Sequence, residues 1–434
     1  MEVAMTAKDT CAKNFNTALD LGRPPNIKQL FPNSKALIVS GKYIDRAMIK
    51  KGGAMTIAAN ARNTFVLRGA LMAAQRADAA IIIEIARSEG GTNAYCAVNL
   101  WNMARQVDAI CNELHITIPV AVHADHFGLK KPQDLDLAKT EIPSLFDAGI
   151  TSIAIDASHM PDSLNLLANL ELNPFIPPWA GLETEVGEIK GASGLSTPEE
   201  ALFLIQGLNA HNIIPDWIAL NNGTTHGIEA SGTGIDVALT REIHEALAPY
   251  GTSGAQHGTS GNSSDRLRQI ASLTRTTKAN VATALQMISW GVEVNDFGNA
   301  ILDDNGNFIK KKDQGASEAV WQQMLGTAER LGIRGGDFKK LNLPFENSLL
   351  AQPKKTRERM VKGVEEFVYT LLTTVFNAQG TASIAMDEIL KTGSHNPDPK
   401  AKPIQDPKDW TRELIMEKGA MIESDKGPDG NFDD

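Results

Sequence analysis

Short apolar, β-branched runs alternate with helical patterns along most of this chain, and this alternation constrains the fold more than any other feature of the sequence. It begins near residue 54 and is typical of parallel strands joined by crossover helices. Eight strands are predicted, at residues 55–59, 80–85, 118–123, 151–156, 179–186, 216–221, 252–257 and 290–295. Helices are predicted between them at 63–76, 100–114, 133–148, 162–170, 198–210, 236–248 and 262–273.

A closed (β/α)₈ TIM barrel explains this pattern better than an open doubly wound sheet, because no GxGxxG motif follows the first strand. The open sheet is the alternative. The clearest helix start is at Pro198, where Thr197 offers an N-cap hydroxyl and Glu199 and Glu200 favour the helix dipole. The predicted organisation is a lead-in at 1–50, a barrel core at 51–298 and an irregular insertion at 299–352. A barrel-closing helical extension at 353–390 and a weakly ordered or partner-dependent tail at 391–434 follow.

Charge and cysteine content exclude several classes of protein. The 434 residues include 42 Lys and Arg against 52 Asp and Glu, a formal net charge of -10. No global basic field exists, so neither nucleic acid nor an anionic membrane is expected as a partner, and an anionic substrate must be held locally. The three cysteines have no disulfide or zinc-motif spacing, which favours a reducing compartment, and we expect the cytoplasm. The N-terminal residues lack the continuous apolar run of a secretory signal, so none is expected, and the longest apolar runs are too short to predict a membrane span.

Three of the nine histidines, His126, His226 and His257, follow directly after predicted strands. Side chains at the carboxyl ends of barrel strands point into one shared mouth. Three imidazoles there suit a divalent metal with an open position for substrate. The alternative is three unrelated polar histidines in loops, but their placement at three strand ends favours the metal site.

Carboxylates surround the same strand ends. Glu183 and Glu185 are two apart and therefore face the same side of a strand, where either could bind the metal or orient a ligating histidine. They could equally be ordinary carboxylates at the barrel mouth. Asp125 could exchange a proton with a hydroxyl of the bound substrate. His123 is interpreted as a structural histidine.

The loop at residues 251–261 is rich in Gly, Ser and Thr and precedes a predicted helix. Such a loop offers backbone N–H groups to an anion, and barrel phosphate sites are commonly built after strands seven and eight. A plain turn is the alternative. His257 lies within this loop, which favours the anion site.

Four motifs in this order, HADH, LETEVG, GTTHG and HGTSG, resemble the class II, metal-dependent fructose- and tagatose-bisphosphate aldolase family over roughly residues 50–300. The resemblance implies a role for each matching residue. The implied metal ligands are His126, His226, His257 and, as a second contact, Glu185. The implied contacts to phosphate or to a monovalent cation are Gly227, Gly258 and Ser260. The implied substrate-side residues are Asn60, Ser88 and Asn295.

The resemblance also implies a mechanism. Zinc, or another divalent transition metal, polarises the carbonyl of a ketose and stabilises the enediolate formed by C–C cleavage. Asp125 is the acid and base at the hydroxyl that becomes the aldehyde. The implied substrate is a phosphorylated ketose such as fructose 1,6-bisphosphate, with dihydroxyacetone phosphate as one product. A homodimer or homotetramer is also implied, and residues 299–352 could form a subunit contact.

Three departures from the family pattern question the substrate. The stretch GEIKGASGLS carries Ala192 and Ser193 where members have an acidic pair. The proton shuttle on the enediolate carbon is then Glu188, a residue from elsewhere such as the insertion, or absent. The lysine-containing motif of strand eight, with its Asn and Asp/Ala-Thr pair, is replaced by Glu293 and residues 296–298. The insertion and the C-terminal part have no obvious counterpart in shorter members.

Two rival functions follow from these departures. One is an aldolase-like protein that acts on a different ketose or serves as an accessory subunit. The other is a metal-dependent hydrolase of the amidohydrolase type, which needs an HxH pair on its first strand. The first-strand segment TIAANARN lacks that pair.

Overall fold

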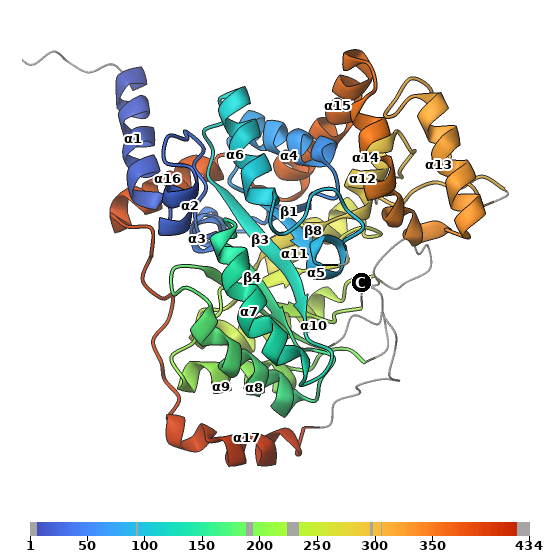
Figure 1. Ribbon diagram of the computed structural model, residues 1–434. Coiled ribbons are helices and arrows are strands. Elements are labelled where there is room, and N and C mark those ends of the chain that lie inside the picture. The colour runs from blue at the N-terminus through green and yellow to red at the C-terminus, as the bar shows by residue number, and fades with distance from the viewer. Residues whose placement is uncertain are drawn as a thin grey trace, which may run out of the picture.

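The computed structural model describes residues 7–92, 94–187, 194–223, 234–295, 298–304 and 306–422. Its centre is a closed barrel in which each parallel strand pairs with the next in sequence and the last pairs with the first (Figure 1). This confirms the predicted (β/α)₈ barrel and excludes the open sheet. The strands are β1 (Thr56–Asn60), β2 (Ile81–Ala86), β3 (Val120–Gly128), β4 (Ser152–Asp156), β5 (Gly181–Val186), β6 (Trp217–Leu220), β7 (Ser253–Gln256) and β8 (Thr276–Val281).

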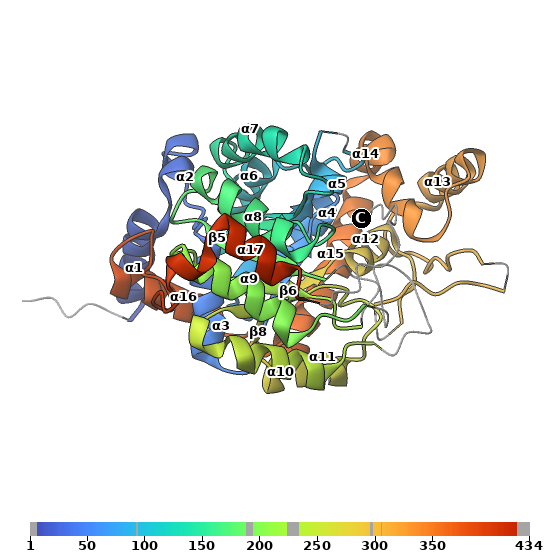
Figure 2. The same ribbon diagram turned by 90° about the horizontal axis from the view of Figure 1, so that it is seen from below.

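Helices surround the barrel, as the view from below shows (Figure 2). Those between successive strands are α4 (Thr64–Ala77), α5 (Arg87–Gly90), α6 (Met103–Leu114), α7 (Asp134–Asp147), α8 (Asp162–Leu172), α9 (Pro198–Ala210), α10 (Val237–Leu247) and α11 (Ser264–Leu273). Before and after them lie α1 (Ala7–Gly22), α2 (Pro25–Leu30), α3 (Gly41–Lys51), α12 (Thr283–Trp290), α13 (Glu318–Leu331), α14 (Asn342–Leu350), α15 (Lys354–Thr370), α16 (Thr381–Thr392) and α17 (Arg412–Gly419). None of the helices in the described ranges combines the length and the apolar character that crossing a bilayer demands.

Local sequence signals set the start of α9. The Thr197 side chain accepts a hydrogen bond from the Glu200 backbone N–H, and the Glu200 carboxylate accepts one from the Thr197 backbone N–H. This reciprocal capping box satisfies donors that the first helical turn leaves without partners. The helix begins at Pro198, as predicted.

The eighth strand lies elsewhere than predicted. Strand β8 covers 276–281, and the predicted strand at 290–295 is wrong. That stretch follows α12 and makes only isolated bridges, from Val292 to Lys310 and from Val294 to Ala300. Alternating valines therefore produce the strand-like pattern at 290–295. The real strand, TTKANV, carries polar residues because its inward side chains meet carboxylates from other strands.

The chain leaves the barrel after α12 and returns with α15. Helix α15 packs against α4 and α12 and so occupies the position of the eighth outer helix. Gly69 makes the approach to α4 possible, because a Cβ atom there would lie 2.7 Å from the Val364 Cβ. The excursion between them, at 291–353, includes α13, the 3-10 helix η3 (Gly335–Leu341) and α14.

The end of the barrel opposite the strand carboxyl ends is covered by α3 and by the C-terminal segment. The Lys400 Nζ lies 2.5 Å from Asp45 Oδ2 on α3 and donates to the Asp216 carbonyl at 2.8 Å. Trp410 is buried, and its ring packs at a tilt of 50° against that of Phe203, with the ring centroids 5.5 Å apart. Residues 391–422 are therefore not the weakly ordered tail that their Pro, Asp and Lys content indicates, because a buried ion pair and a buried aromatic ring attach them to the barrel.

Candidate active site

A bulge in β3 creates the centre of the site. The register of β3 against β4 shifts between Ala124 and Phe127, so Asp125 and His126 together occupy the irregular position. His126 has a φ of 40°, in the left-handed region that non-glycine residues rarely adopt. Successive side chains of a regular strand face opposite sides. Here Asp125 and His126 both line the cavity at the barrel mouth, so the bulge places two reactive groups side by side.

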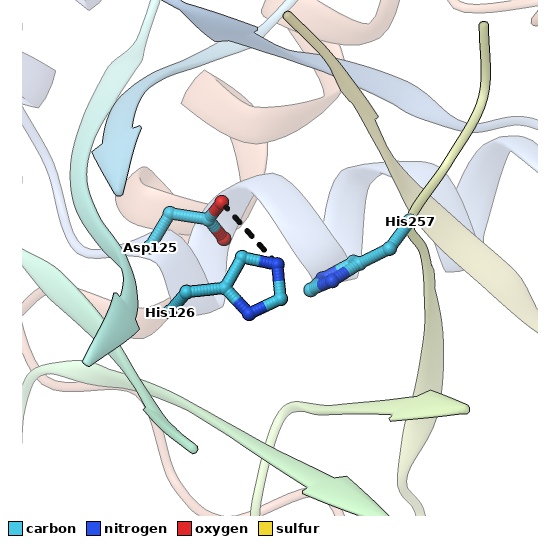
Figure 3. Close-up of side chains that lie close together, drawn as sticks. All are labelled: Asp125, His126 and His257. Atoms are coloured by element: carbon cyan, nitrogen blue, oxygen red, sulfur yellow. Dashed lines mark ion pairs between the residues drawn. The ribbon is translucent and has the colours of Figure 1, made fainter. Parts of the chain in front are cut away.

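His257, just after β7, completes a compact group with these two residues (Figure 3). Its ring lies 4.3 Å from the His126 ring between centroids, at an interplanar angle of 76°. The His126 Nε2 lies 4.0 Å from Asp125 Oδ2. One nitrogen or oxygen from each of the three residues lies within 4.8 Å of the others. Two of the predicted metal ligands and the predicted acid/base are thus brought together from two distant strands.

The carboxylates of β4 and β5 orient the two imidazoles. The Glu185 Oε1 lies 3.1 Å from His126 Nδ1, and Asp156 Oδ2 lies 3.2 Å from the same nitrogen. The Glu183 Oε1 lies 2.9 Å from His257 Nε2, so that nitrogen donates its proton to the carboxylate. A neutral His257 ring then carries its lone pair on Nδ1, 3.9 Å from Glu185 Oε2.

This donor set fits a divalent transition metal. Two imidazoles and a carboxylate are ligands of the kind that zinc takes, and histidine ligands commonly donate their second N–H to a carboxylate. Both histidines have such a carboxylate partner, Asp156 for His126 and Glu183 for His257. The groups Asp125–His126–His257, His126–Asp156–Glu185 and Glu183–Glu185–His257 each have the spacing of a cation site.

A buried lysine lies beneath these residues. The Lys278 Nζ on β8 donates to Glu183 Oε2 at 2.7 Å and to Asp125 Oδ1 at 3.3 Å, and lies 3.2 Å from Glu84 Oε2. It also lies 3.2 Å from His123 Nε2, which must accept because an ammonium only donates. The Lys278 side chain is fully buried.

These charges set the protonation states of the site. Burial, the largest single cause, would raise the pKa of Asp125, but the Lys278 ammonium together with the neighbouring His126 and His257 outweighs it and holds that pKa well below its ordinary value. Burial and the neighbouring Asp125 raise the pKa of Glu84 well above its ordinary value. Burial would lower the pKa of His126, yet Glu185 and Asp125 outweigh it and raise that pKa. Asp125 is therefore ionised at neutral pH and can accept a proton.

A cavity of about 400 Å³ opens above the group. Its walls come from the ends of β1, β2, β3, β7 and β8 and from the excursion. They include the predicted residues Asn60, Asp125, His126, His257, Gly258 and Ser260. The Asn60 Nδ2 donates to Glu89 Oε2 at 2.6 Å, and Arg62 Nε donates to Glu89 Oε1 at 2.8 Å.

Comparison with known proteins identifies the family of this chain. A family model described as class-II fructose-bisphosphate aldolase matches residues 43–330. The chain belongs to this family. Because fructose-bisphosphate aldolases are lyases, it is an aldolase-family lyase.

Individual aldolases show the same relationship at low identity. The fructose-bisphosphate aldolases of Staphylococcus epidermidis and Staphylococcus aureus are each 28% identical to it, over 45% of this chain and 72% of theirs. The YdjI aldolase of Escherichia coli K12 has a similar fold, with a TM-score of 0.52 at 18% identity, over 80% of this chain and 99% of that one. A fructose-bisphosphate aldolase of Campylobacter jejuni has a TM-score of 0.51 at 16% identity, over 80% and 97%.

Of the predicted site residues, three lie outside the described residues, and three described ones, Ser88, Glu185 and Asn295, are absent from the described cavity lining. Glu188, His226 and Gly227 lie outside the described residues. Ser88 is exposed on α5 and is absent from the described cavity lining. Asn295 lies in a turn after α12, where its Oδ1 accepts from the Asn299 backbone N–H at 3.0 Å, and it is likewise absent from that lining.

The observed position of β8 removes one of the predicted departures from the aldolase pattern, the loss of the strand-eight motif. Lys278, Asn280 and the pair Ala282–Thr283 stand where a strand-eight lysine, asparagine and Ala-Thr pair are expected, so Glu293 replaces nothing. Asn280 takes the position assigned to Asn295, and its Nδ2 donates to Asp125 Oδ1 at 3.0 Å. The order of the lysine, the asparagine and the Ala-Thr pair in the sequence was the signal that could have located β8 and Asn280.

Proposed function

We propose that this aldolase-family protein is metal-dependent and reversibly cleaves a ketose (bis)phosphate such as fructose 1,6-bisphosphate into dihydroxyacetone phosphate and an aldehyde. The single observation that carries the proposal is the β3 bulge, which sets ionised Asp125 beside the imidazoles of His126 and His257. A base next to a cation-binding group is the arrangement that C–C cleavage beside a carbonyl requires.

The metal would be held by His126, His257 and Glu185, with His226 as the further ligand predicted from the sequence. Zinc or a similar divalent ion, when bound, supplies a Lewis acid that polarises the ketose carbonyl. The raised pKa of His126 means that a proton and the metal compete for this ligand. A monovalent cation near Gly227, Gly258 and Ser260 is part of the same proposal.

Asp125 performs the proton transfer. In the cleavage direction its carboxylate takes the proton of the hydroxyl on the carbon that becomes the aldehyde, as the adjacent C–C bond breaks. In condensation it returns that proton. Lys278 and Asn280 both donate to Asp125 Oδ1, which fixes the carboxylate and leaves Oδ2 toward His126. Glu188 is proposed as the shuttle for the proton on the enediolate carbon.

One phosphate of the substrate would lie between the loops after β7 and β8. Gly258, Thr259 and Ser260 follow β7, and Ala282 and Thr283 precede or begin α12, all of them at the cavity. Backbone N–H groups at such loops and at a helix start attract phosphate. The presence of Lys278 and Asn280 on β8 removes one of the reasons for an accessory-subunit role.

A cleavage assay with Asp125→Asn tests the function. Wild-type protein loaded with zinc should cleave fructose 1,6-bisphosphate, and a chelator should abolish the activity. Asp125→Asn should keep its metal content but lose about 10²- to 10⁴-fold in kcat, because the base is gone. Asp136→Asn, an exposed aspartate on α7, is the matched control and should behave as wild type. Full cleavage by Asp125→Asn, or cleavage that survives complete metal removal, would contradict the proposal.

A further inference from the structure

Strand β3 has different neighbours before and after its bulge. Its pairing with β2 continues as far as Ala86, the last residue of β2, which lies opposite Asp125. On the other side, the pairing of β3 with β4 resumes at Phe127 in a shifted register. His126 therefore lies where the support from β2 ends and the register against β4 changes.

Arg87 replaces β2 as the neighbour of β3 beyond the bulge. It directly follows Ala86 and begins α5, which lies beside β3 (Figure 1). Its Nη1 donates to the Gly128 carbonyl at 2.9 Å. Its guanidinium carbon lies 4.4 Å from the centre of the fully buried Phe127 ring, within the range of a cation–π contact. A single side chain thus contacts both of the residues that follow His126.

Glu141 on α7 fixes the direction of this guanidinium. Its Oε2 accepts from Arg87 Nη2 at 2.6 Å and its Oε1 accepts from Arg87 Nε at 3.2 Å. The Arg87 side chain is 21% exposed and that of Glu141 is 6% exposed, so the pair is largely shielded from water. Two parallel hydrogen bonds to one carboxylate hold the planar guanidinium in a defined orientation. The remaining nitrogen is thereby directed at Gly128.

The bulge needs such support because His126 has a left-handed backbone conformation. A φ of 40° is unfavourable for a residue with a side chain and persists only where the surrounding structure enforces it. On the β4 side, the Leu129 backbone N–H donates to the Asp156 carbonyl at 2.8 Å, and the Asp156 carboxylate lies 3.2 Å from His126 Nδ1. Arg87 supplies the contacts on the β2 side, so the bulge is held from both sides.

We propose that Arg87, oriented by Glu141, is a positioning residue that fixes the β3 bulge and thereby the directions of Asp125 and His126. Arg87 and Glu141 are both absent from the described lining of the cavity, so they act through the backbone of β3 and not by contact with substrate. The proposal rests on the proposed aldolase function and adds to it two residues that control how the site is assembled.

Three variants and a matched control test this role in the full-length protein. Arg87→Lys keeps the charge but loses the fork that contacts Glu141 and Gly128 together. Arg87→Met removes the charge and leaves the buried Glu141 carboxylate without it. The double variant Arg87→Met/Glu141→Gln removes that unpaired carboxylate as well. Arg68→Met is the control, because Arg68 makes the same kind of two-point pair with Glu113, between α4 and α6.

Zinc affinity and the kinetic constants are the first measurements. The zinc dissociation constant, obtained by competition with a chelating dye and without substrate, should rise about ten- to a hundredfold in all three Arg87 variants. At saturating zinc, kcat for fructose 1,6-bisphosphate should fall about ten- to a hundredfold while KM changes less than about threefold, because the base and the metal ligand are misplaced. The Arg68→Met protein should match wild type in all three values.

Urea unfolding separates positioning from a purely structural role. The double variant should be more stable than Arg87→Met, because no buried carboxylate is left without its partner. The positioning role predicts that its zinc dissociation constant nevertheless stays raised. A double variant that binds zinc and turns over substrate like wild type would refute the proposal.

A crystal structure of the double variant tests the role of Arg87 independently of activity. The backbone of His126 should leave the left-handed region, and Asp125 and His126 should no longer face the cavity together. A bulge that is unchanged in this variant overturns the positioning role, whatever the kinetics. A wild-type protein that neither binds zinc nor cleaves fructose 1,6-bisphosphate refutes the proposed function instead, and the crystal structure still decides the role of Arg87.

Discussion

Replacement of Lys278 by methionine should destabilise the protein strongly, because this buried ammonium compensates the carboxylates inside the barrel. It contacts Glu183, Asp125 and Glu84 at 2.7, 3.3 and 3.2 Å. At an effective dielectric constant of about 20, each contact near 3 Å contributes on the order of 5 kcal/mol of gross attraction. Desolvation of the ion offsets several kcal/mol of this sum.

The net effect follows from what remains after the substitution. Methionine fills a similar volume but leaves Glu183 and Asp125 buried without their cation. Removal of one partner of a buried ion pair costs about 3–5 kcal/mol, and we expect a loss of this size in the free energy of unfolding. Glu84 contributes less to the loss, because its raised pKa favours the neutral carboxyl.

Equilibrium unfolding in urea, followed by tryptophan fluorescence, measures the change. Lys362→Met is the matched control, since this exposed lysine also lies near two carboxylates, Glu365 and Glu366, at 3.0 and 2.6 Å. Its loss should cost less than about 1 kcal/mol. In the double variant Lys278→Met/Glu183→Gln, the loss should be smaller than the sum of the two single losses by at least about 1 kcal/mol. A Lys278→Met protein as stable as Lys362→Met would refute the reasoning.

Three further predictions concern the metal, pH and the C-terminal segment. His257→Ala should lose most of its bound zinc in elemental analysis. His211→Ala, at the C-terminal end of α9, where the ring contacts the Trp410 carbonyl, should keep one equivalent. Equal metal content in both variants would remove His257 from the site. Burial lowers the pKa of His244 to about 3. Below pH 6.5 the unfolded state therefore binds a proton that the folded state does not, and the free energy of unfolding decreases as the pH is lowered. Between pH 7 and pH 5 this one group should lower the free energy of unfolding by about 2 kcal/mol, measured as the difference between wild type and His244→Gln. An identical dependence of stability on pH in both proteins would contradict this prediction. Lys400→Met should lower the free energy of unfolding by about 3 kcal/mol because Asp45 loses its buried cation, and an unchanged urea midpoint would show that the segment is not part of the folded core.

The sequence alone was sufficient for most of the barrel. Strands such as β2 and β4 are short runs rich in isoleucine and alanine, buried along their whole length, and α9 starts with a capping box that can be read directly. These signals are local, because hydrophobic periodicity and capping depend on residues within a few positions of each other. The residues Asp125, His126 and His257 could be found in the same way, since each lies within a few residues of the end of a predicted strand.

The tertiary structure decided what depends on partners distant in the sequence. TTKANV is a barrel strand because the Lys278 ammonium meets carboxylates of β2, β3 and β5, and nothing near it in the chain indicates them. The same holds for the bulge that turns Asp125 and His126 toward one cavity and for Lys400 beneath the barrel. Hydrophobic patterns depend on residues that are close together in the sequence. Buried charges are stable only beside counter-charges, which the closed barrel brings together from distant positions.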